Sequence, residues 1–91
     1  MSVFFTPISA SENAGTTSGA ASAVGGAEVV LCTNANATTA YLVTLEQADG
    51  TDIGSFVLPG GGIVHVFKGR TDKMFAANTN VKFTKSTYPR G

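Results

Sequence analysis

Short apolar runs separated by turn-forming residues occupy the chain from Glu28 onward, and this spacing limits the possible folds more than any other feature. The runs are about five to eight residues long and begin roughly ten residues apart. None of them shows the apolar spacing of an amphipathic helix over a sufficient length. Five clear runs occupy residues 28–34, 40–47, 53–58, 63–68 and 81–88, and residues 74–77 are ambiguous between a strand and a helical turn. We therefore predict an all-β fold, a small antiparallel β-sandwich or barrel of five to six strands with an extended N-terminal arm.

Alternating side chains and a strong turn signal support this assignment. Tyr41, Val43 and Leu45 alternate with other residues, which places them on one face of a strand. The pair Asp49-Gly50 follows this run and predicts a hairpin, because both residue types tolerate the positive φ that tight turns need.

The N-terminal residues differ in composition from the rest of the chain. All but three of residues 9–27 are Gly, Ala, Ser or Thr. Such a segment offers little apolar surface to offset the entropy that is lost when it becomes ordered. We therefore divide the chain into an extended N-terminal arm and linker, residues 1–27, and a β-domain, residues 28–91.

The tip of this arm is apolar. Its candidate partner-binding residues are Val3, Phe4, Phe5 and Ile8. An apolar tip on a slender tether either folds back on its own sheet or adds as a strand to a neighbouring molecule, and the sequence leaves both arrangements open. A β-domain of about 64 residues has a marginal core, and a chain with one cysteine forms no internal disulfide. Association with other molecules is then the remaining source of added stability.

Charge is polarised along the chain although the formal net charge is zero. Residues 1–67 carry five acidic and no basic residues, whereas residues 68–91 carry six basic residues and one acidic residue. The two halves either neutralise each other within one molecule, or attract each other between copies, or present a basic face to an acidic partner. Arg70 and Lys73 are the candidate partner-binding residues for the intermolecular cases.

Residues that could support catalysis are isolated from one another in the sequence. His65, the single histidine, lies in mid-strand between valines, and Cys32, the single cysteine, alternates with apolar neighbours, so we assign both to the sheet. Asp49 and Asp52 frame a turn but lack the third nearby acid of a calcium loop. We expect no enzymatic activity, no metal and no cofactor. No run approaches the roughly 18 apolar residues of a membrane helix, so we expect no membrane partner.

The C-terminal half resembles a known group of proteins. In AYLVTLEQADGTDIGSFVLPGGGIVHVFKGRTDKMFAANTNVKFTKSTY, residues 40–88, a strand ending near VT leads through a short turn to IGSF, and a TDKMFAA segment precedes the closing strand NVKFTKSTY. This order of strands and turns resembles small virion proteins of tailed bacteriophages, particularly those of marine and cyanobacterial phages. The resemblance implies a multicopy assembly protein and brings no catalytic residue with it.

We therefore expect a non-enzymatic virion structural protein, made in the host cytoplasm and located in the virion. The role that fits best is a capsid decoration or cement subunit, which binds the major capsid protein or other virion proteins and forms a homo-oligomer or multicopy assembly. Two alternatives stay open. One is a tail- or fibre-associated binding module, and the other is a small nucleic-acid-binding β-barrel with Lys82 and Lys85 in its basic strand. The zero net charge weighs against nucleic acid as a partner.

Overall fold

The prediction of an all-β antiparallel fold is confirmed by the computed structural model, which describes residues 10–86. Residues 1–9 and 87–91 are not described, and the apolar tip falls in the first of these ranges. The strands of the described part are β1 (Glu12–Asn13), β2 (Val29–Asn34), β3 (Tyr41–Glu46), β4 (Asp52–Leu58), β5 (Ile63–Phe67), β6 (Lys73–Ala76) and β7 (Val81–Lys85), and one short 3-10 turn, η1, spans Ser18–Ala20. Six strands follow Glu28, in agreement with the predicted five to six, and the ambiguous residues 74–77 fall mostly in β6.

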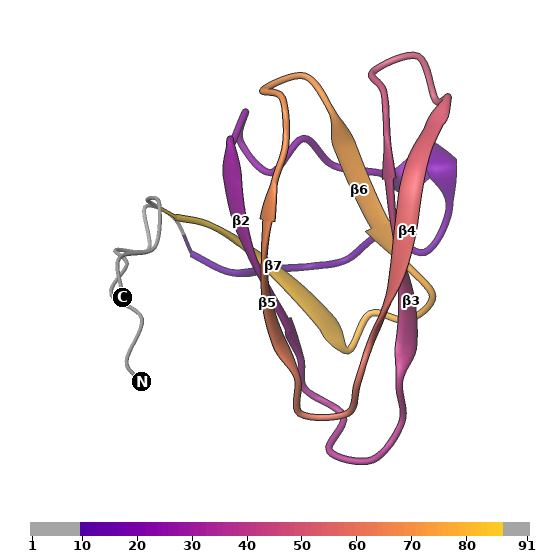
Figure 1. Ribbon diagram of the computed structural model, residues 1–91, viewed down its shortest axis with the longest axis vertical. Helices are drawn as coiled ribbons and strands as arrows, with labels where there is room; N and C mark the ends of the chain where they lie inside the picture. Colours follow the sequence, from indigo (N-terminus) through magenta and orange to yellow (C-terminus); the bar gives the residue numbers. More distant parts are fainter. Residues whose placement is uncertain (1–9, 87–91) are drawn as a thin grey trace.

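The strands pair as a nested series around one central hairpin. Two sheets face each other, one with the order β1-β7-β2-β5 and the other with the order β4-β3-β6 (Figure 1). β3 pairs with β4 as the innermost hairpin. The strands that flank this hairpin in the sequence, β2 and β5, pair with each other, and the outermost strands, β1 and β7, also pair. Ser22 forms an isolated antiparallel bridge with Met74 of β6, which supplies the remaining nested pair. With Ser22 counted as a one-residue strand, this is the strand order of a jelly roll.

The predicted turn between β3 and β4 forms as the sequence indicates. Gly50 adopts a φ of 93°, which favours glycine, and the Asp49 carboxylate accepts a hydrogen bond from the backbone N–H of Thr51 at 2.9 Å. This hydrogen bond lowers the pKa of Asp49. The N–H of Gln47 donates to the carbonyl oxygen of Thr51 at 2.7 Å and closes the hairpin.

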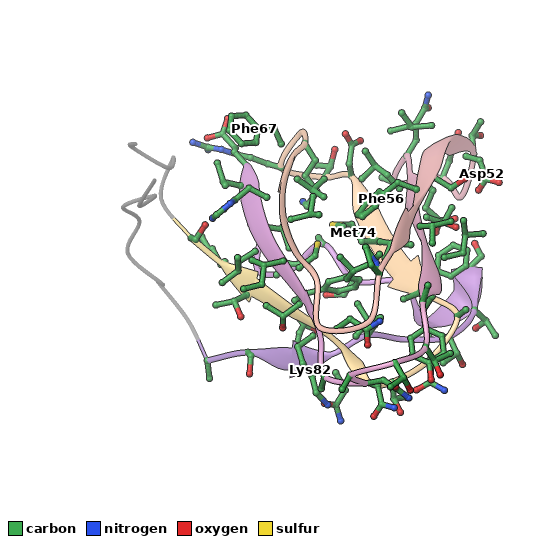
Figure 2. All side chains as sticks on the ribbon, turned by 60° about the horizontal axis from the view of Figure 1, so that its bottom comes forward. Asp52, Phe56, Phe67, Met74 and Lys82 are labelled. Atoms are coloured by element: carbon green, nitrogen blue, oxygen red, sulfur yellow. The ribbon has the colours of Figure 1, made fainter. Side chains whose placement is uncertain are left out.

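The core lies between the two sheets and is built from their inward faces. Cys32, Val43, Met74 and Phe83 come from four different strands, and each is fully buried. Figure 2 shows Met74 and Phe56 inside the sandwich, and Phe56 packs against the buried cluster. Burial of an apolar side chain of this size stabilises a fold by about 1.5–3 kcal/mol, which makes this cluster the main source of stability.

Residues 10–27 belong to the sandwich, which differs from the expected division at residue 27. β1 pairs with β7 in the register Glu12↔Phe83, and the N–H of Ala14 donates to the carbonyl oxygen of Val81 at 2.9 Å. Ser22 and Met74 exchange two backbone hydrogen bonds, of 3.0 and 2.8 Å. Backbone pairing therefore holds a segment whose side chains are too small to do so.

Small side chains also let this segment enter the core. Ala14, Val24 and Ala27 are each at most 2% exposed and join the buried cluster. Gly15 lies so close to the backbone of Ala20 that a Cβ atom there would overlap with it. Val24 adopts a φ of 54°, a costly conformation for a β-branched residue, and its N–H donates to Ser22 Oγ at 2.9 Å.

Candidate interaction surface

β4 is a strongly exposed edge strand. Five of its seven residues are exposed. It ends the three-stranded sheet, with β3 on one side and no strand of residues 10–86 paired on the other. Figure 1 shows it on the far side of the molecule from the first described residues. Asp52–Ser55 and Val57 are therefore accessible to solvent, whereas Leu58 is fully buried.

The backbone groups of Ser55 and Val57 point toward the open edge. The N–H of Ala77 donates to the carbonyl oxygen of Leu42 at 2.9 Å, so Leu42 directs its backbone groups to β6. Hydrogen-bonded and non-hydrogen-bonded pairs alternate in an antiparallel ladder, so Val57, which lies opposite Leu42, directs its N–H and C=O away from β3. Ser55 lies two residues earlier and has the same orientation. Such an edge is a template for one more strand.

Apolar side chains line the outer side of the same strand. Leu42 and Val57 lie opposite each other and are 46% and 63% exposed, and Ile53 is 49% exposed. From Gly54 to Leu58 the strand has no charged residue and no proline. Natural edge strands commonly carry one or the other, which discourages pairing with a further strand. β4 lacks that protection over these five residues.

A second apolar area lies on the outer face of the four-stranded sheet. Ile63 and Phe67 of β5 are 67% and 57% exposed. Figure 2 shows Phe67 at the periphery of the molecule. His65 lies between them, is half-buried and is opposite Leu31 of β2, which confirms its assignment as a residue of the sheet.

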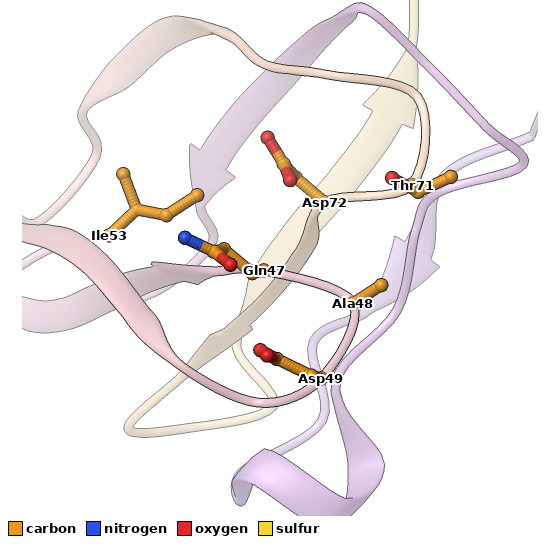
Figure 3. Close-up of a pocket in the computed structure, with 6 residues that line it drawn as sticks. All are labelled: Gln47, Ala48, Asp49, Ile53, Thr71 and Asp72. Carbon is orange, nitrogen blue, oxygen red and sulfur yellow. The ribbon is translucent and has the colours of Figure 1, made fainter.

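An open hollow of about 470 Å³ lies where the β3–β4 turn meets the β5–β6 turn (Figure 3). Its lining includes the carboxylates of Asp49 and Asp72. Asp49 accepts the Thr51 N–H, and Asp72 accepts the Gly69 N–H at 3.0 Å, so each carboxylate stabilises its own turn. The hollow is shallow and polar, and its acids have structural roles.

Glu46 is a buried acid that the sequence pattern did not single out. It is 1% exposed, although it lies at the end of β3. The single O–H of Ser18, in η1, donates to this carboxylate, whose two oxygens lie 3.1 and 2.9 Å from Ser18 Oγ. Ser18 is thereby the side chain that ties the N-terminal segment to β3.

Two further titratable groups are buried. Cys32 is fully buried, which confirms it as a small core residue. Burial also raises the pKa of its thiol to about 12, which favours the unreactive thiol form. Burial lowers the pKa of Lys68, and nearby Asp72 acts in the opposite direction. Lys68 Nζ donates to the carbonyl oxygen of Gly69 at 3.1 Å.

The predicted partner-binding residues fall in different places. Val3, Phe4, Phe5 and Ile8 lie outside the described residues. Arg70 is exposed and lies 3.6 Å from Glu28, the one ion pair within residues 10–86, whereas Lys73 is half-buried on β6 opposite Glu46. The structure therefore does not bring Arg70 and Lys73 together with β4's open edge.

The lysines of β7 are engaged within the molecule. Lys82 Nζ donates to Asn13 Oδ1 at 2.6 Å and to the carbonyl oxygen of Thr79 at 3.1 Å. Lys85 Nζ donates to the carbonyl oxygen of Gly25 at 3.2 Å. Both lysines thus help to hold neighbouring segments against β7.

Residues 10–86 contain no group of three or more His, Cys, Asp or Glu residues arranged to hold a metal ion. The same part of the chain contains no helix long and apolar enough to cross a membrane. Comparison of the chain with known protein families, with curated proteins and with solved structures finds no match. The exposed edge of β4 is therefore the surface feature from which we infer a function.

Proposed function

We propose that this chain is a non-enzymatic structural subunit of a bacteriophage virion, and that it decorates or cements the capsid. In this role it binds the major capsid protein and neighbouring copies of itself. A partner that binds only the folded subunit stabilises the folded state by mass action, and a small domain with a marginal core benefits from this. A shell presents many equivalent positions, so weak contacts add up over the particle.

The exposed edge of β4 is the observation that carries this proposal. A strand of seven residues, five of them exposed, offers unpaired backbone groups beside Leu42 and Val57. Strand addition at such an edge gives affinity through main-chain hydrogen bonds and specificity through alternate side chains. It needs no pocket and no catalytic group, and therefore suits a mechanical role.

The strand order adds support by analogy. Jelly rolls occur in viral capsid proteins, although they also occur in lectins and cupins. A fold alone does not determine function, so this analogy ranks below the β4 edge. It agrees with the resemblance of residues 40–88 to small virion proteins of tailed phages.

The composition of purified particles tests the proposal. Particles of the tailed phage that encodes this chain are banded by density, and their proteins are quantified by mass spectrometry against the major capsid protein. We expect the chain at a fixed ratio and in tens to hundreds of copies per particle. Absence of the chain from the particles would contradict a virion role, and a few copies per particle would contradict the decoration role.

A further inference from the structure

We propose that the open edge of β4 accepts residues 3–8 of a second copy of this chain as an added strand. The inference rests on the proposed function, because it names the contact between neighbouring copies. The donor segment precedes Ala10, and the first described residues lie on the opposite side of the molecule from the acceptor strand β4 (Figure 1). The contact is therefore head to tail.

The length of the N-terminal segment argues against pairing with the β4 of the same molecule. Residue 8 is two residues before Ala10, the first described residue, so its Cα atom lies within about 7 Å of that of Ala10. Ala10 leads into β1, at one edge of the four-stranded sheet, whereas β4 ends the opposite sheet. Figures 1 and 2 both show the start of the described chain and β4 on opposite sides of the molecule.

The size of the sandwich completes this argument. Three strand spacings separate β1 from β5, which amounts to about 14 Å, and facing sheets lie about 10 Å apart. Two residues of extended chain reach about 7 Å, which is less than either distance, so the chain before Ala10 is too short for the whole segment 3–8 to pair with the β4 of its own molecule. A second copy supplies the same acceptor without this restriction.

The chemistry of the two segments is complementary. Residues 3–8, VFFTPI, are rich in β-branched and aromatic residues and carry no charge. Gly54–Leu58 of β4 also carries no charge, and Ser55 and Val57 direct their backbone groups outward. A strand added there places alternate side chains against the exposed Leu42 and Val57 on one face. The lone Pro7 is acceptable on the outer edge of the enlarged sheet.

This geometry predicts how copies associate. A donor on one side and an acceptor on the other produce a heterologous contact, which closes into a ring or continues as a chain. On a shell, the spacing of the underlying subunits would decide between these outcomes. Since residues 10–27 are held within the sandwich, the segment that extends to the neighbour is short, and neighbouring copies must lie close together.

Two defective variants of the full chain test the proposal by complementation. Ser55→Pro removes the outward N–H of the acceptor without removing a bond to β3, and Ser55→Ala is its matched control because it keeps that N–H. Phe4→Ala with Phe5→Ala removes the apolar donor side chains and leaves β4 intact. Association is measured by sedimentation velocity over a range of concentrations, and each variant's folding is checked by its unfolding transition.

We expect the wild-type chain and Ser55→Ala to associate equally, whereas Ser55→Pro and the double phenylalanine variant each associate at least tenfold more weakly. A mixture of these two variants should form a 1:1 heterodimer, because one supplies the donor and the other the acceptor. Should Ser55→Pro lose its unfolding transition, Val57→Lys takes its place, since a charge on an edge strand also discourages pairing.

Three results would overturn the inference. These are wild-type-like association of the acceptor variant, a mixture that stays monomeric, and a wild-type chain that is monomeric at millimolar concentration. None of them changes the copy number of the chain in purified particles. The proposed function and this inference can therefore fail separately.

Discussion

At the scale of single residues, Glu46 needs hydrogen-bond donors, because it is a buried acid. Ser18 meets this need with one hydroxyl within 3.1 Å of both oxygens. We expect Ser18→Ala to lower the free energy of unfolding by about 1–3 kcal/mol, since it leaves the buried acid without that donor. Urea unfolding of both proteins measures the difference.

The neighbouring Thr17 provides the control for this substitution. Its side chain makes no capping hydrogen bond to η1, and the residue is exposed. Thr17→Ala should change the free energy of unfolding by about 0.5 kcal/mol or less. Equal effects of the two substitutions would show that the hydroxyl of Ser18 does not support Glu46.

Cys32 gives the fold a pH dependence on the alkaline side. Burial raises the pKa of its thiol from 9.0 to about 12, so the unfolded chain loses this proton at lower pH than the folded chain does. The contribution of Cys32 to the free energy of unfolding is therefore fully present below pH 9 and is lost as the pH rises from 9 toward 12. We expect the contribution of Cys32 to unfolding free energy to fall by about 1.4 kcal/mol per pH unit in that window. Parallel pH profiles for the wild-type chain and Cys32→Ala, measured by urea unfolding, would contradict this.

At the scale of elements, the N-terminal segment is held by close backbone approach. Gly15 has no room for a side chain against Ala20, whereas Gly19 meets only Thr17 Oγ1, at 3.9 Å. We expect Gly15→Ala to destabilise the fold by about 1–3 kcal/mol and Gly19→Ala by about 0.5 kcal/mol or less. Thermal unfolding of the two variants distinguishes them, and equal stability would mean that the turn at residues 15–20 does not pack as described.

Local patterns predicted the strands but not the packing of this segment. Alternation in residues 40–47 placed Tyr41, Val43 and Leu45 on one face of a strand, and in the structure all three belong to or pack against the core. Burial of Ala14 and Ala27 has no such signal, because alanine and glycine show no apolar periodicity. The pairing of Glu12 with Phe83 joins residues far apart in the sequence, so no local pattern reveals it.

Sequence patterns also did not predict the candidate interaction surface. The run at residues 53–58 predicts a strand, but the strand's position at the edge depends on the order of strands in the sheet. That order follows from the nested pairing of the whole chain. The exposed fractions of Leu42 and Val57 likewise reflect what packs over the sheet, which alternation alone does not determine.

At the scale of the whole molecule, the first described residues and the open edge of β4 lie on opposite sides of the sandwich (Figure 1). Figure 2 shows Asp52 and Lys82 far apart on the molecule. One ion pair, between Arg70 and Glu28, forms within residues 10–86. Glu46 also lies opposite Lys73, so the fold brings part of the acidic half against the basic half within one molecule.

Residue-resolved hydrogen exchange tests the central claim, strand addition at β4, most directly. In a dilute monomeric sample, the amides of Ala14 and Ser22 should be protected by their bonds to Val81 and Met74, and those of Ser55 and Val57 should exchange rapidly. On association at higher concentration, we predict that Ser55 and Val57 become protected while Ala14 and Ser22 stay unchanged. Association that leaves the Ser55 and Val57 amides in rapid exchange would contradict the claim.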